Sequence, residues 1–135
     1  MLEILSPYLP TLWCLLAAGG LILIQLLVAD VIGLSNGHVP GSVVAASHKN
    51  IHFRATRAHA NTNESVAAFI LLVLGGVALG ATPVWLNGLS IAYCAARVAH
   101  MLFYWSGLSI ARSLSFIVSL VSLVGLLIVG VATAF

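Results

Sequence analysis

The stretch from Arg54 to Ser65, RATRAHANTNES, concentrates charged and amide side chains directly before one of the most apolar runs of the chain. Arg57, Asn61 and Glu64 follow one another at intervals of four and three residues, so they share one face of a helix. Arg54 precedes Arg57 by three residues and extends this polar face. Such a face is costly against lipid, which favours a site for a polar, acidic ligand.

A second set of polar side chains lies further along the chain, in RVAHMLFYW and ARSLSF. Arg97, His100 and Tyr104 are spaced so that they share a helical face, and Arg112 with Ser113 opens the last apolar run. We expect both sets at one depth of the membrane. Together they hold four arginines against one glutamate, and this positive surplus favours an anionic partner.

The rest of the chain is almost free of charge. Of its 135 residues, 61% are hydrophobic and 6% are charged, whereas roughly a quarter of the residues in a soluble domain are charged. This composition predicts an integral membrane protein without a soluble domain. We expect no nucleic-acid partner.

The apolar runs predict four membrane-spanning helices, at about residues 10–34, 55–79, 83–105 and 110–134, because one crossing needs about 20 residues. GATP, at residues 80–83, predicts a tight turn, and a polar loop at about residues 35–53 joins the first two helices. The predicted fold class is all-α: a single domain over residues 1–135, folded as an up-and-down four-helix bundle in the membrane.

The five basic residues indicate the orientation of the bundle, since all lie near the first or the third connection. These connections share one side of an up-and-down bundle, and the positive-inside rule makes that side cytoplasmic. His38, His48 and His52 lack the spacing of metal ligands, so we expect solvated loop histidines and no metal site.

Two other interpretations of the polar residues follow from the sequence. Arg57 or Arg97 could pair with Glu64 only to hold helices together, and Asp30 could neutralise one more arginine. A small proton-coupled transporter predicts an acidic residue deep in the first helix, whereas residues 4–29 are uncharged.

RATRAHANTNES, RVAHMLFY and ARS, in this order, resemble the MAPEG family, the membrane-associated proteins in eicosanoid and glutathione metabolism, and in particular its bacterial members. The resemblance covers about residues 8–134. It implies a homotrimer with glutathione bound between neighbouring subunits, in a bacterial inner membrane with the site on the cytoplasmic side.

The resemblance also implies roles for single residues. The residues that would contact glutathione are Arg57, Asn61, Glu64, Arg97 and Tyr104, and we add Arg54 because it extends the same polar face. Arg112 would stabilise the thiolate of glutathione, and Ser113 would either donate a hydrogen bond to the sulfur or cap its helix. The implied activity is a glutathione transferase or peroxidase for lipophilic electrophiles or lipid hydroperoxides. A non-catalytic lipid-binding or scaffold member of the family is the alternative.

Overall fold

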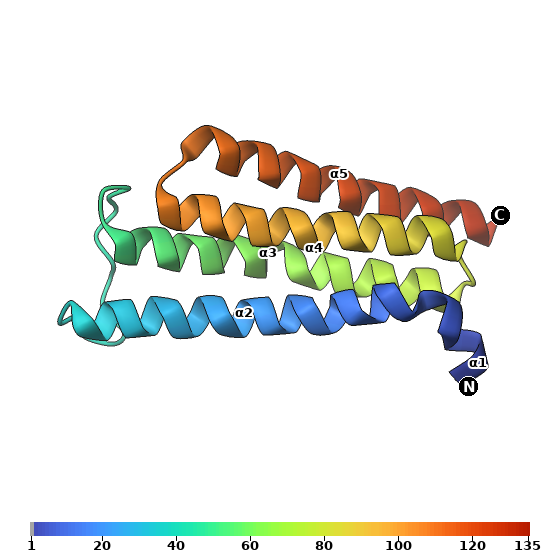
Figure 1. Cartoon of the computed structure of the whole chain (residues 1–135), viewed down its shortest axis with the longest axis horizontal. Helices are drawn as coiled ribbons and strands as arrows, with labels where there is room; N and C mark the ends of the chain where they lie inside the picture. Colours follow the sequence, from blue (N-terminus) through green and yellow to red (C-terminus); the bar gives the residue numbers. More distant parts are fainter. Residues whose placement is uncertain (1) are drawn as a thin grey trace.

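The computed structural model describes residues 2–135, and these residues form helices joined by turns and loops (Figure 1). A short helix and a 3-10 turn precede four long helices. The elements are α1 (Leu2–Leu5), η1 (Ser6–Tyr8), α2 (Leu9–Ser35), α3 (Ile51–Ala78), α4 (Pro83–Ser106) and α5 (Ser109–Ala134). The described residues contain no strand, so the predicted all-α fold class is confirmed.

The four long helices lie side by side and alternate in direction (Figure 1). Both termini and the turn at residues 79–82 lie at one end of the bundle. The loop at residues 36–50 and the link between α4 and α5 lie at the other end, which we call the loop end. The predicted up-and-down topology is therefore confirmed.

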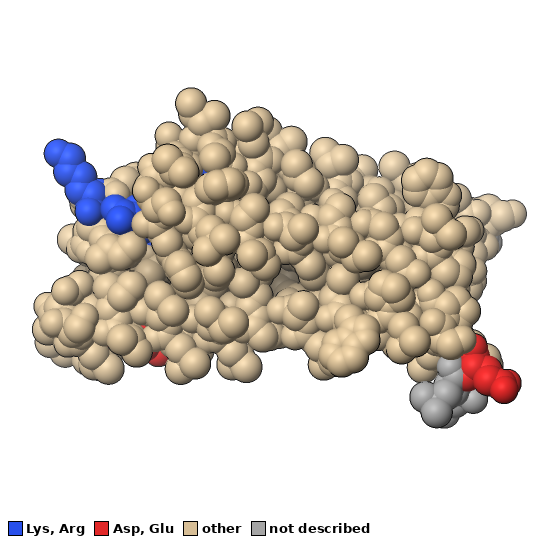
Figure 2. All heavy atoms as spheres, viewed as in Figure 1, with Lys and Arg blue, Asp and Glu red and all other residues tan. Residues whose placement is uncertain are grey.

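Three segments are long and apolar enough to cross a membrane: Glu3–Ser35, Ile51–Ala78 and Ser109–Thr133. The remaining long helix, α4, carries Arg97 and His100 and runs alongside the other three (Figure 1). Figure 2 shows Lys and Arg atoms toward the loop end, whereas the long flank between the two ends is uncharged in this view. This arrangement is that of an integral membrane four-helix bundle with one basic end.

The second long helix begins at Ile51, four residues before the predicted position 55. The side chain of Asn50 caps it by accepting a hydrogen bond of 2.9 Å from the backbone N–H of His52. His52 consequently lies in the first turn of α3 and is buried against Gly33 of α2. A Cβ atom at Gly33 would lie 2.8 Å from His52 Nε2, so the glycine makes room for the histidine ring. The expectation of a solvated loop histidine is therefore wrong for His52, whereas His48 is exposed.

The apolar core occupies the half of the bundle near the termini. Phe69 of α3 and Tyr93 of α4 stack there with ring centres 4.2 Å apart. Gly76 allows the fully buried Leu86 to approach α3, since a Cβ atom at Gly76 would lie 2.7 Å from Leu86 Cδ1. This packing fixes α3 against α4, and the polar side chains of both helices gather in the other half.

Candidate functional site

A cavity of about 420 Å³ opens among α3, α4 and α5 in the half of the bundle near the loop end. Its walls combine polar and apolar side chains from all three helices. The lining residues are Asn61, His100, Tyr104, Arg112, Ser113, Phe116 and Ile117. Four of them, Asn61, Tyr104, Arg112 and Ser113, were predicted site residues, so the structure brings these four together.

The side chain of Arg112 lies over the ring of Tyr104. Its guanidinium carbon is 4.5 Å from the ring centre, which is a cation–π contact. Within residues 2–135 this guanidinium makes neither a side-chain hydrogen bond nor an ion pair. Its N–H donors therefore remain available to a molecule in the cavity.

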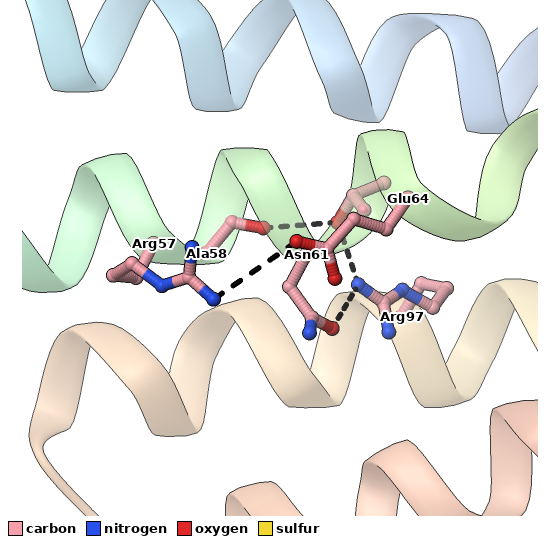
Figure 3. Close-up of polar contacts among 6 residues, drawn as sticks. Arg57, Ala58, Asn61, Glu64 and Arg97 are labelled. Carbon is pink, nitrogen blue, oxygen red and sulfur yellow. Dashed lines mark hydrogen bonds and ion pairs between the residues drawn. The ribbon is translucent and has the colours of Figure 1, made fainter.

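Arg57 and Glu64 form an ion pair beside the cavity, with 4.0 Å between Arg57 Nη2 and Glu64 Oε1 (Figure 3). Both residues belong to α3 and flank Asn61 along its polar face. The pair lies within one helix, so the interpretation that it holds two helices together is wrong. Both side chains are largely exposed, at 43% and 61%, so either group can turn toward a ligand.

Arg97 lies behind the cavity wall, although it was predicted to contact the ligand. Its side chain is 1% exposed and is not part of the cavity lining. Arg97 Nη2 donates to Asn61 Oδ1 at 2.9 Å and to Thr62 Oγ1 at 3.0 Å, so it joins α4 to α3 (Figure 3). Arg97 therefore links the two helices through Asn61 and Thr62, and the described residues contain no ion pair between Arg97 and Glu64, so the interpretation that these two residues pair is wrong.

Arg54 is not part of the cavity lining either, although it was grouped with the binding residues. Its Nε donates to the carbonyl of Trp105 at 3.1 Å, and its Nη1 donates to the carbonyls of His48 at 2.8 Å and Lys49 at 3.2 Å. Arg54 therefore satisfies a carbonyl in the last turn of α4 and fixes the 36–50 loop to it. The resulting contacts are structural.

Ser113 is on the cavity wall, but its hydroxyl proton is already used. Ser113 Oγ donates to the carbonyl of Ser109 at 3.0 Å. Leu108 is the N-cap residue of α5 and no side chain caps this helix, so the helix-cap interpretation of Ser113 is wrong.

His100 is a cavity residue to which the sequence assigned no ligand role. Its ring is 2% exposed and lies between Tyr104 and Phe116, with ring centres 5.4 Å and 6.4 Å away. Its Nδ1 has no hydrogen-bond partner in the described chain. The three-residue spacing from Arg97 placed His100 on the correct face, and this spacing was the available signal.

Asp30 does not neutralise any of these arginines. It is exposed on α2 and lines a different cavity of about 430 Å³, whose wall also includes His38, His52 and His59. The described residues contain no ion pair of Asp30. The positive surplus at the loop end therefore persists in the folded chain.

Comparison with known proteins found a family model that matches nearly the whole chain. The model of the MAPEG family matches residues 10–132, which include every residue of the cavity wall. No curated protein and no solved structure matches the chain.

Proposed function

The chain belongs to the MAPEG family, and from this premise we propose that it is a glutathione-dependent transferase or peroxidase for lipophilic electrophiles or lipid hydroperoxides. The family includes glutathione transferases and peroxidases as well as non-enzymatic members, and it generally uses glutathione. The observation that carries the proposal is the unpaired guanidinium of Arg112 on the wall of the cavity.

In this proposal Arg112 activates the thiol of glutathione. A guanidinium beside the sulfur stabilises the thiolate relative to the thiol, and the thiolate is the nucleophile. The ring of Tyr104 holds the guanidinium of Arg112 by a cation–π contact, which leaves the N–H donors of Arg112 free. We assign thiolate stabilisation to Arg112 alone, because the proton of Ser113 is donated to Ser109.

The polar face of α3 binds the rest of the tripeptide. Glutathione carries two carboxylates and one ammonium group. The ion pair between Arg57 and Glu64 is long and exposed, so a ligand can replace it: Arg57 donates to a carboxylate, and Glu64 accepts from the ammonium group. Asn61, between these two residues, contributes its amide group.

The second substrate enters from the bilayer, past the apolar side chains of Phe116 and Ile117. With an electrophile, the thiolate attacks carbon, a leaving group departs with the bonding electrons, and a thioether forms. With a hydroperoxide, the thiolate attacks the terminal oxygen, and the O–O bond breaks. This step gives glutathione sulfenic acid and an alkoxide, which takes up a proton. A second glutathione then reduces the sulfenic acid, which gives glutathione disulfide and water.

We also propose a homotrimer in a bacterial inner membrane, with the loop end in the cytoplasm. The family is generally oligomeric. The basic residues Lys49, Arg54, Arg57 and Arg112 are near the loop end, in agreement with the positive-inside rule.

Turnover by the purified protein in detergent tests the proposal. Glutathione is supplied with an aryl halide in one assay and with an organic hydroperoxide in another, and Arg112→Ala serves as the matched control. Thioether or alcohol formation that Arg112→Ala loses supports the enzyme. Binding of glutathione without turnover of either class supports the non-catalytic, lipid-binding alternative.

A further inference from the structure

Arg97 is the largest fully buried side chain of the described residues, and its contacts point to a specific task. We propose that Arg97 is a positioning residue that holds the amide of Asn61 with its NH2 group toward the cavity. The site then requires a hydrogen-bond acceptor, a carboxylate or carbonyl oxygen, at that point of the ligand. This inference rests on the proposed binding of glutathione.

The contact with Arg97 fixes the orientation of the Asn61 amide. A guanidinium can only donate hydrogen bonds, so the atom of Asn61 that faces Arg97 Nη2 at 2.9 Å must be the amide oxygen. The NH2 group then occupies the other branch of the amide. Asn61 lines the cavity, and its Nδ2 has no partner in the described chain, so this NH2 group is free to donate to a ligand.

A second hydrogen bond orients Arg97 itself. Its Nη2 also donates to Thr62 Oγ1 at 3.0 Å, and Thr62 donates its own proton to the carbonyl of Ala58 at 3.2 Å. The hydroxyl of Thr62 therefore offers only lone pairs to Arg97. Arg97 and Thr62 are each 1% exposed, and Nε and Nη1 of Arg97 have no partner in the described chain, so the two bonds of Nη2 alone orient the guanidinium. Figure 3 shows Arg97 of α4 reaching Asn61 on α3.

The consequence is selectivity. A freely rotating asparagine can present either its oxygen or its NH2 group to a ligand, whereas the fixed amide of Asn61 presents donors only. A ligand donor placed opposite Asn61 would stay unpaired, and an unpaired polar group in a partly buried site costs affinity.

A double-mutant cycle on glutathione affinity tests this role. The variants are Asn61→Ala, Arg97→Gln and the double variant, measured by calorimetry in detergent. We expect Asn61→Ala to weaken binding about 10-fold, as for the loss of one hydrogen bond to a charged group. We expect Arg97→Gln to weaken it less, about 5-fold, because the freed asparagine can still turn its NH2 group to the ligand but must be ordered on binding. Arg97→Gln should cause no further loss, within about 2-fold, when Asn61 is already alanine.

Asn61→Asp separates positioning from a purely structural role. A carboxylate still accepts from Arg97, so we expect the melting temperature to be kept, while the lost donor should weaken glutathione binding at least as much as Asn61→Ala. If Arg97→Gln does not fold, Thr62→Val replaces it in the cycle. It removes one of the two acceptors of Arg97, and we expect a loss of about 3-fold that disappears in the Asn61→Ala background.

The outcomes are distinguishable. Additive losses, with a wild-type protein that binds glutathione, overturn the positioning role and leave the proposed function standing. A wild-type protein that does not bind glutathione overturns the proposed function, and this inference with it.

Discussion

The guanidinium of Arg112, near the start of α5, lies over the ring of Tyr104, near the end of α4, at 4.5 Å from its centre. The short link through Gly107, with a φ of 77°, turns the chain sharply enough for this contact. The ring face attracts the cation without accepting any of its N–H bonds in a fixed geometry. Arg112 is therefore held in place and yet free to bind an anion.

The contact predicts different results for two substitutions of Tyr104. Tyr104→Phe keeps the ring face and should leave kcat/KM with glutathione near the wild-type value. Tyr104→Leu removes the cation–π contact, worth about 0.5 to 2 kcal/mol, so kcat/KM should fall about 3- to 30-fold. Equal losses in both variants would show that the hydroxyl of Tyr104, and not its ring, is what the reaction needs.

Ser113→Ala should have little effect. Ser113 donates its proton to the carbonyl of Ser109 and is not available to the sulfur. We therefore expect the fraction of bound glutathione present as thiolate to change by no more than about 2-fold, the range of a mild surface substitution. Ultraviolet absorbance of the thiolate measures this fraction. A large decrease in Ser113→Ala would show that the hydroxyl of Ser113 does stabilise the thiolate.

Glu64→Gln should weaken glutathione binding with little loss of stability. The ion pair with Arg57 is exposed, and such pairs contribute about 0 to 1 kcal/mol to folding. The charge-assisted bond to the ligand ammonium group is stronger, so we expect the Kd for glutathione to rise about 10-fold. A glutathione analogue without the amino group is the control: its Kd should be the same for wild type and variant, and a rise for both ligands would contradict the assignment.

Two adjacent glycines of α3 test the packing that holds α3 against α4. A methyl group at Gly76 would lie 2.7 Å from the buried Leu86, whereas one at Gly75 meets no atom within 4 Å. Overpacking costs about 1 to 3 kcal/mol, and alanine gains about 1 kcal/mol over glycine in a helix. Gly76→Ala should therefore melt at a lower temperature than Gly75→Ala in the same detergent. The reverse order would contradict the close approach of Leu86.

Most of the fold could be predicted from the sequence, because bilayer thickness fixes the length of an apolar helix and GATP marks the turn between the second and third helices. The start of α3 was placed too late. The polar residues after Ser47 are typical of a loop, but the cap by Asn50 allows the helix to begin at Ile51.

The site was predictable in part. Periodicity placed Asn61 and Tyr104 on the correct faces, and the opening of the last apolar run placed Arg112 at their depth; these residues do meet at one cavity. Periodicity cannot tell whether a face turns to a cavity or to a neighbouring helix, so Arg97 was assigned to the ligand although it is buried behind Asn61. Arg54 was assigned to the ligand for a similar reason: its long side chain reaches the carbonyl of Trp105, which lies near it only in the folded chain.

The role of Arg112 is tested most directly by comparing glutathione with S-methylglutathione on wild type and Arg112→Ala, with calorimetry for affinity, ultraviolet absorbance for the thiolate and a turnover assay for kcat/KM. S-methylglutathione has no thiol to ionise, so its Kd reports on the binding face alone. We predict a thiolate signal in the wild type that is lost in Arg112→Ala, a decrease in kcat/KM of about 100-fold or more, and a similar Kd for S-methylglutathione in both proteins. A thiolate signal that survives in Arg112→Ala, with full affinity for glutathione, would contradict the central role of Arg112.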